Sequence, residues 1–421
     1  MTRMRIKHII AALVIAALAW APIAESTLYI DIVKSPRRLP IAVADLAGLY
    51  GQEISKIIRE DLEASGVFDP LNPRGFIENP SVAFDPANWS GTGAEAVVKG
   101  HVDPGAELGV TVRLYDVVDA KPLMEKQYRA GRAVIRPLAH SIANDIYRHI
   151  TGQDGIFRSK VLYIVRETDG GFTLNIADWD GERVQSYRLQ ANLLMSARWS
   201  PDSGRVVYSA ERGRRWSIYM LDLTTMKETE AVRLAGTTIA GDFTPDGGAF
   251  LLSSTKEGTS DIYSFDLRAG TARRITKAFG IEVSPSASPD GKSIAYVSDR
   301  SGTPQIYTMD YMGYNNTRVT YEGNYNTSPS WSPTGELIAF SGRADGGNQI
   351  FVVRPDGSGL TKLTSKGNNE EPSFSPDGRQ IVFTSERDGY KAVYVMRVDG
   401  QAQKRISPRG KVAYSPRWSP K

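Results

Sequence analysis

The side chains best suited to acid–base or metal chemistry in this 421-residue chain are its histidines and carboxylates, because the sequence contains no cysteine. The four histidines are His8, His101, His140 and His149. All of them precede the repetitive second half of the chain, so a histidine-ligated metal or a serine–histidine–aspartate triad cannot be built there. His140 falls on an amphipathic helical pattern, and we interpret it as a surface or packing residue rather than a ligand.

The carboxylates are therefore the remaining candidates for catalysis. Four of them occupy the same place in a recurring Ser/Thr-Pro-Asp corner, at Asp202, Asp246, Asp290 and Asp377. A catalytic site needs asymmetry, so repetition favours a turn-forming role. The chain also lacks a nucleophile elbow, a phosphate-binding loop and a dinucleotide fingerprint. An enzyme acting on carbohydrate or peptide remains an alternative, and it would need two carboxyl groups ~5–9.5 Å apart across a pocket.

The corner motif recurs at a nearly constant period. Its prolines are Pro201, Pro245, Pro289, Pro333, Pro376 and Pro420, in steps of 44, 44, 44, 43 and 44 residues. Each period contains four short apolar runs, which is typical of one β-propeller blade. Residues 161–165 lack a preceding corner, whereas residues 417–420 form a corner with nothing after it. The last strand therefore supplies what the first blade lacks, and residues 160–421 are predicted to form six blades.

The first half of the chain has a different pattern. Residues 25–150 mix strand-like runs with two amphipathic helical patterns, near residues 54–67 and 133–150. A short linker, residues 151–159, follows. The predicted fold is an α+β N-terminal domain followed by an all-β six-bladed β-propeller.

Residues 1–24 have the order of a signal peptide. Arg3, Arg5 and Lys7 precede an apolar stretch at residues 9–20, and small residues follow. The alternative is an uncleaved anchor, although the apolar stretch is short for a spanning helix, which needs about 20 residues. The mature chain would carry 48 basic and 47 acidic residues. This balance gives no electrostatic case for nucleic acid, and export predicts a periplasmic protein.

The residues that precede each corner do not repeat. We expect them to form connectors that gather at one mouth of the propeller, where scaffolded loops commonly bind partners. They mix apolar and acidic side chains, and aromatic residues and Met are favoured at interfaces. The alternative is six solvated connectors without a partner. The candidate contact residues are Met195, Ile239, Glu282, Val283, Ser284, Tyr325, Asn326, Glu370, Glu371 and Tyr414.

Taken together, the chain resembles the TolB family of the bacterial Tol–Pal envelope system. The resemblance rests on the signal peptide, the mixed domain, the Thr-Gly and Gly-Ile-Phe-Arg motifs of residues 151–158, and six repeats of the Trp-Ser-Pro-Asp-Gly type. Three corners depart from the motif: Ser203 replaces the glycine, Thr334 replaces the aspartate and Thr244 replaces the serine. These corners should be less tightly specified.

The resemblance implies a non-enzymatic adaptor without a cofactor or metal. Members of the family bind the lipoprotein Pal across the propeller mouth and engage TolA through the mature N-terminal strand. The resemblance thus implies a monomer that reaches membranes through partners and supports outer-membrane integrity and cell division. A membrane-anchored propeller sensor is the alternative if residues 1–24 persist. The TolA-binding strand would comprise Leu28, Tyr29, Ile30, Asp31 and Ile32.

Overall fold

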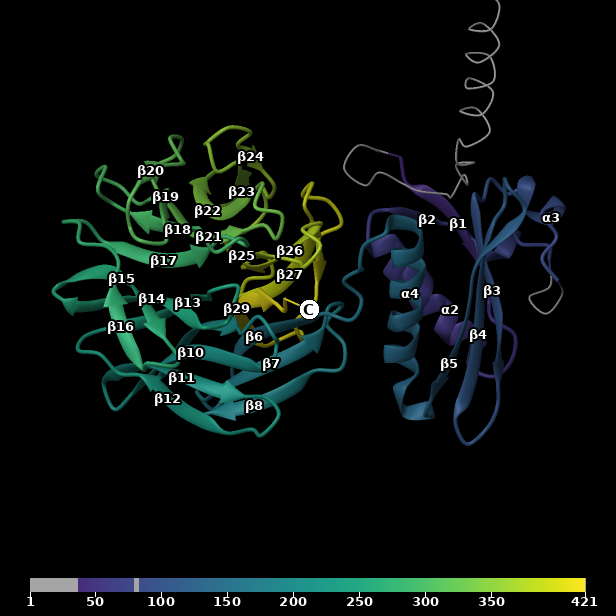
Figure 1. Ribbon diagram of the computed structural model, residues 1–421, viewed down its shortest axis with the longest axis horizontal. Coiled ribbons are helices and arrows are strands. Elements are labelled where there is room, and N and C mark those ends of the chain that lie inside the picture. Colours follow the sequence, from purple (N-terminus) through teal and green to yellow (C-terminus); the bar gives the residue numbers. More distant parts are fainter. Residues whose placement is uncertain (1–36, 79–82, 421) are drawn as a thin grey trace, which may run out of the picture.

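A computed structural model describes residues 37–78 and 83–420, which form an N-terminal α/β domain beside a β-propeller (Figure 1). Figure 1 looks nearly along the propeller axis, so that the six sheets surround a common centre. The predicted signal peptide and the predicted TolA-binding strand lie outside the described residues.

The N-terminal domain is a sheet covered by helices. Its strand order is β2-β1-β3-β4-β5, with β1 parallel to both of its neighbours and the other pairs antiparallel. Apolar residues at helical spacing, such as Ile54 and Ile58 in α2 and Ile142 and Ile146 in α4, are buried in the shared core. In Figure 1 these two helices lie between the sheet and the propeller. The elements are β1 (Leu39–Val43), α2 (Gly51–Ala64), β2 (Phe68–Pro70), η1 (Pro73–Gly75), α3 (Ala87–Ser90), β3 (Ala96–Asp103), β4 (Leu108–Asp116), β5 (Lys121–Ala130), η2 (Arg132–Val134) and α4 (Ile135–Thr151).

The propeller consists of six four-stranded antiparallel sheets, which confirms the predicted fold class. Five sheets are built from consecutive strands, and the innermost strand of each comes first. Their strands are β9 (Leu193–Trp199), β10 (Arg205–Arg212), β11 (Arg215–Asp222), β12 (Glu228–Val232), β13 (Thr238–Phe243), β14 (Ala249–Glu257), β15 (Thr259–Asp266), β16 (Thr271–Arg274), β17 (Glu282–Ala287), β18 (Ser293–Ser298), β19 (Gln305–Asp310), β20 (Thr317–Arg318), β21 (Asn326–Trp331), β22 (Ile338–Ala344), β23 (Gly347–Val353), β24 (Thr361–Lys362), β25 (Asn369–Phe374), β26 (Gln380–Ser385), β27 (Ala392–Arg397) and β28 (Lys404–Arg405).

The sixth sheet joins the two ends of the propeller sequence. Its order is β29-β6-β7-β8, with β29 (Val412–Trp418), β6 (Lys160–Arg166), β7 (Phe172–Asp178) and β8 (Gln185–Leu189). The antiparallel register places Val412 opposite Arg166 and Trp418 opposite Val161. This closure confirms the predicted count of six blades, and it pairs edges that an open array would expose.

The corner aspartates are turn formers, as predicted. Asp202 Oδ1 accepts hydrogen bonds from the Ser200 hydroxyl at 2.5 Å and from the Gly204 amide at 3.0 Å. Both bonds favour the ionised carboxylate. The bond from the Ser200 hydroxyl has the larger effect, and together the two bonds lower the pKa of Asp202 below its ordinary value. Equivalent hydroxyl bonds link Thr244 to Asp246 at 2.5 Å, Ser288 to Asp290 at 2.6 Å and Ser375 to Asp377 at 2.5 Å.

The corner with Ser203 in place of glycine has a strained backbone conformation at that residue. Ser203 adopts φ = 58°, in the left-handed region that glycine occupies at the same place in other corners, such as Gly247 (φ = 69°) and Gly378 (φ = 71°). This corner therefore departs from the motif in sequence but keeps its conformation.

Closure of the ring depends strongly on Trp418. Its side chain is 5% exposed, and its indole N–H donates to Ser159 Oγ at 2.6 Å. We expect Trp418→Ala to cost about 3–5 kcal/mol of unfolding free energy, as is typical for a buried aromatic residue. Removal of residues 417–421 should in addition open the ring and expose two strand edges.

Chemical denaturation followed by circular dichroism measures both changes. Trp216→Ala is the matched control, because Trp216 is only half-buried on an outer hairpin. An unchanged unfolding midpoint for Trp418→Ala, together with a monomeric truncated protein, would show that the closing strand is dispensable.

Candidate functional site

The propeller has two ends that differ in what they contact. At the corner end lie the turns that follow the innermost strands, and at the mouth end these strands begin. The N-terminal domain meets the corner end: Gln380 Nε2, just after a corner, donates to Ala64 O at 2.9 Å. A cavity at the same junction is lined by Asn144 and Arg148 of α4 and by Pro333 and Pro376 of two corners. These contacts of the N-terminal domain lie at the corner end, beside the corners of a few blades.

The sequence predicted that the candidate residues lie in connectors. The structure places them in the innermost strands instead. The exception is Tyr325, which directly precedes β21. Met195 lies in β9; Ile239 in β13; Glu282, Val283 and Ser284 in β17; Asn326 in β21; Glu370 and Glu371 in β25; and Tyr414 in β29.

A repeated β-bulge explains why the sequence pattern did not predict strands at these residues. The register of each innermost strand shifts near its middle, for example between Tyr414 and Arg417. Five of these strands carry a residue other than glycine with φ between 52° and 56°, namely Ser196, Ser284, Ser328, Glu371 and Ser415. A bulge breaks the alternation of side chains on which strand prediction depends.

Two candidate residues prove to be buried rather than presented to a partner. Glu282 is 0% exposed, and its Oε1 accepts hydrogen bonds from Ser298 Oγ at 2.9 Å and from Arg300 Nη2 at 2.6 Å. Asn326 is 3% exposed, and its Nδ2 donates to Gln305 Oε1 at 2.8 Å. The expectation that these two side chains face a partner is wrong, because polar groups inside a blade must satisfy each other.

Glu371 and Tyr414 join neighbouring blades. Glu371 Oε1 accepts a bond from Ser415 Oγ at 2.7 Å, and Oε2 accepts one from Ser415 N at 2.8 Å. Tyr414 Oη donates to Leu194 O at 2.9 Å, across the closure of the ring. Burial, followed by the negative charge of Glu371, raises the pKa of Tyr414 above its ordinary value. Both residues therefore stabilise the inner wall of the propeller.

Glu370 is held by a cation. Its Oε2 accepts from Lys391 Nζ at 3.0 Å and its Oε1 from Asn348 Nδ2 at 2.8 Å. Burial by itself would raise the pKa of Glu370, but the Lys391 ammonium outweighs it and leaves the pKa below the ordinary value. The acidic character that the sequence suggested for the mouth is thus largely neutralised inside the blades.

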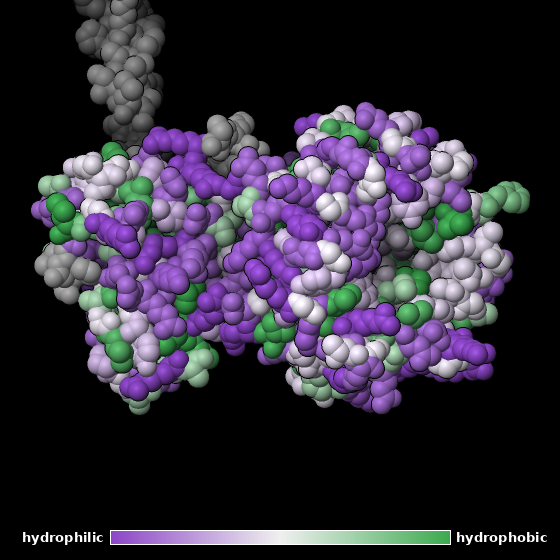
Figure 2. Space-filling view, turned by 180° about the vertical axis from the view of Figure 1, so that it is seen from behind, coloured by the Kyte–Doolittle hydropathy of each residue, from purple (hydrophilic) through white to green (hydrophobic). Residues whose placement is uncertain are grey.

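Apolar side chains remain exposed at the mouth end. We define the mouth surface by five residues at or just before the start of innermost strands: Leu193, Phe279, Ile281, Tyr325 and Val412. Their exposed fractions are 48%, 106%, 52%, 41% and 36%. Figure 2 shows apolar side chains scattered among polar ones on the propeller, with one apolar group that projects from the edge farthest from the N-terminal domain.

Sequence reasoning found only Tyr325 of these five residues. The others lie at a strand start or one to three residues before it, and Phe279 stands between two small residues, Ala278 and Gly280. An apolar residue that fits no strand pattern was the available signal, since an exposed apolar group has no folding role to explain it.

His140 lies in a buried polar network between the domains. Its Nδ1 is 2.7 Å from Asp61 Oδ2, and its Nε2 is 3.9 Å from Asp180 Oδ2. His140, Asp178 and Asp180 offer ligand atoms within 4.8 Å of one another, a spacing that could hold a metal ion. However, Arg136 pairs with Asp180 and Lys160 pairs with Asp178. These cations already balance the carboxylates, so we interpret the group as an ion network and His140 as a packing residue.

Asp61 gives this network a pH dependence. Burial raises the pKa of Asp61 from 3.8 to about 6, although His140 opposes the shift. Because the folded state binds this proton more tightly than the unfolded chain, Asp61 stabilises the fold below about pH 4, and this contribution is lost as the pH rises through 6. Relative to Asp61→Asn, the parent protein should gain about 2 kcal/mol of unfolding free energy between pH 7 and pH 4.5.

Urea unfolding of both proteins at the two pH values measures this difference. Glu63→Gln is the control, because Glu63 is an exposed acid of the same helix. A difference between parent and Asp61→Asn that does not change with pH would mean that Asp61 is ionised throughout.

The axial cavity of the propeller does not offer the pair of carboxylates that the alternative enzyme would need. A cavity of about 360 Å³ lies on the propeller axis at the corner end, where Asp242 is the one carboxylate residue that lines it. Its Oδ1 lies 3.0 Å from Arg198 Nε. A glycosidase of the usual kind needs two carboxyl groups that face one substrate.

The described residues contain no helix long and apolar enough to cross a membrane.

Comparison with protein families identifies the two parts of the chain. Residues 147–421 match the family described as the TolB beta propeller domain, and residues 28–123 match the TolB amino-terminal domain. The chain belongs to the TolB family. This confirms the resemblance inferred from the corner repeats and the order of parts.

Individual relatives give the same result. The chain is 35% identical over 207 residues to the Tol-Pal system protein TolB of a Polaromonas species and 33% identical over 253 residues to that of Paramagnetospirillum magneticum. These alignments cover 48% and 56% of this chain, and 48% and 57% of the relatives. The chain thus spans about half the length of the curated relatives it matches.

A solved structure extends the similarity to nearly the whole chain. The crystal structure of TolB from Acinetobacter baumannii is 28% identical, with a TM-score of 0.81, and the match covers 91% of this chain and 97% of that one. Family members therefore share both the N-terminal domain and the propeller described above.

Proposed function

We propose that this TolB-family protein is a periplasmic, non-enzymatic adaptor of the Tol–Pal envelope system. It binds the lipoprotein Pal at the propeller mouth and TolA through its N-terminal segment, and thereby supports outer-membrane integrity and cell division. Family membership and the names of the relatives support the place in this system. The signal-peptide pattern supports export to the periplasm. The protein acts as a monomer and reaches the membranes through its partners.

The observation that carries this proposal is the mouth surface. Its aromatic and aliphatic side chains are exposed at one end of a rigid propeller, although folding gives them no role there. Exposed apolar groups that folding does not explain favour a protein-binding site, and aromatic residues commonly supply much of the binding energy. Because Glu282 and Glu371 are bonded within the blades, we expect apolar contacts rather than acidic groups to dominate the affinity for Pal.

The structural roles of the acidic residues in the propeller support the proposal that the protein is not an enzyme. The corner aspartates form turns, and the inner-wall acids link strands and blades. The paired acids that a hydrolase needs are therefore occupied in structural roles.

Phe279→Asp combined with Ile281→Asp tests the Pal interface. Charges at these positions should weaken Pal binding at least tenfold, mainly through faster dissociation, since truncating a central interface residue alone costs ~2 kcal/mol or more. The control is Met312→Asp, because Met312 is 59% exposed in the β19–β20 turn at the corner end. Surface plasmon resonance with the soluble domain of Pal measures both rate constants. Equal affinities in the two folded variants would move the interface away from the mouth.

Deletion of residues 25–33 tests the TolA interaction. An alternating segment at a chain end can add as a strand to a partner's sheet. The deletion should abolish TolA binding while the propeller's unfolding temperature and Pal binding stay unchanged. Retained TolA binding would place the TolA site elsewhere on the protein.

A further inference from the structure

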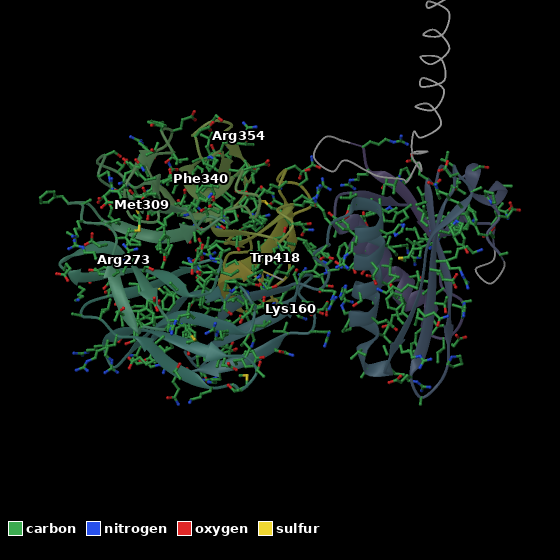
Figure 3. All side chains as sticks on the ribbon, in the orientation of Figure 1. Lys160, Arg273, Met309, Phe340, Arg354 and Trp418 are labelled. Atoms are coloured by element: carbon green, nitrogen blue, oxygen red, sulfur yellow. The ribbon has the colours of Figure 1, made fainter. Side chains whose placement is uncertain are left out.

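One position of the repeat forms a ring around the propeller axis. It lies three residues before each corner proline, in each innermost strand, and it carries two basic, one acidic and three hydroxyl side chains. Its residues are Arg198, Asp242, Ser286, Ser330, Ser373 and Arg417. All except Ser286 line the axial cavity of about 360 Å³ at the corner end. Trp418, which lines the same cavity, is labelled in Figure 3 on the side of the propeller that faces the N-terminal domain.

The single acid of this ring is already satisfied. Asp242 Oδ1 lies 3.0 Å from Arg198 Nε, and Asp242 Oδ2 accepts a bond from the Ser286 hydroxyl at 2.7 Å. Asp242 therefore neutralises Arg198, and each of its two oxygens already has one partner within the ring. A metal ion in this cavity would in addition be repelled by two guanidinium groups.

Arg417 is the charge that lacks a counter-ion. Among residues 37–78 and 83–420 it forms no salt bridge, and its Nη1 donates only to carbonyl oxygens, those of Pro416 at 2.9 Å, Glu371 at 3.3 Å and Pro372 at 3.4 Å. The Glu371 carboxylate is itself bonded to Ser415. Burial, followed by the positive charge of Arg198, lowers the pKa of Arg417 to about 9, although the negative charges of Asp242 and Glu371 oppose the shift. The surroundings thus disfavour this positive charge, which a negative ligand would stabilise.

Further donors accompany the guanidinium groups. Ser330 contributes a hydroxyl to the cavity wall. Trp331, which also lines the cavity, has a buried indole N–H without an acceptor in the described part of the chain. A buried donor without a partner is costly, so the cavity offers positive charge and hydrogen-bond donors to a ligand that supplies acceptors.

We propose that the axial cavity binds a small oxyanion, a phosphate or carboxylate group, with Arg417 as its main contact and Arg198 as a secondary one. Guanidinium groups bind such anions with strong, charge-assisted hydrogen bonds. The ligand is either a free anion or a carboxylate side chain from a protein docked at the corner end. This site is separate from the mouth surface and does not depend on the proposed function.

Titration with sodium phosphate at constant ionic strength tests the site. The parent protein should show a saturable rise in unfolding temperature, since a ligand that binds only the folded state stabilises it. Arg417→Gln should abolish this response, and its unfolding temperature without phosphate should be equal to or above that of the parent. Arg214→Gln, at an exposed position of the β10–β11 turn, should respond like the parent. Broadening of the phosphorus-31 resonance of phosphate gives a direct second measurement.

The outcomes separate a binding site from a structural role. If Arg417→Gln does not fold, Arg198→Gln should still weaken phosphate binding several-fold, and Arg417→Lys should retain a weaker response. Competition between acetate and phosphate would assign the site to carboxylates as well, and competition by a peptide that carries glutamate side chains would identify a protein side chain as the source. The proposal is overturned if the parent shows no saturable response or if Arg417→Gln keeps the full response. The Phe279→Asp, Ile281→Asp variant should retain the phosphate response. A wrong assignment of the Pal-binding surface can therefore be told apart from a wrong assignment of the oxyanion site.

Discussion

Pairing of β29 with β6 is the constraint on which the rest of the structure depends. It completes the sixth sheet and closes the ring, so that β6 does not keep the unpaired edge that it would have without β29. Closure fixes the inner strands around one axis, and it places Tyr414 against Leu194 and Trp418 against Ser159. The same strand therefore holds the mouth, the axial cavity and the junction with the N-terminal domain in fixed relation. Any partner that binds to one of them meets a rigid surface.

The innermost strands divide the propeller into two chemically different ends. Apolar side chains such as Phe279 and Tyr325 are exposed just before the starts of these strands. Three residues before the corners, the same strands direct Arg198, Asp242 and Arg417 toward the axial cavity. A single repeat thus supports an apolar surface at the mouth end and a basic cavity at the corner end, because the two positions face different surroundings.

Much of the fold could be predicted from the sequence, because its signals are local and repeated. The period of the corner prolines gave the number of blades, and the incomplete ends at residues 161–165 and 417–420 gave the closure. The turn role of Asp202 followed from its repetition. The candidate site could be predicted only in part. The sequence pattern assigned Glu282 and Glu371 to connectors, but Arg300 holds Glu282 inside its blade and Ser415 holds Glu371 against the neighbouring blade. Such pairings join residues up to 44 positions apart, and neither composition nor periodicity encodes them.

The central claim is that Pal docks on the mouth end of the propeller. Hydrogen–deuterium exchange of the full mature protein, with and without the soluble domain of Pal, tests it most directly, because amide protection reports a covered surface without any substitution. The account predicts that Pal slows exchange at residues 277–283, 321–326 and 408–414, while the corner turns and the N-terminal sheet exchange at unchanged rates. Protection confined to the corner turns, with the mouth residues unaffected, would contradict it.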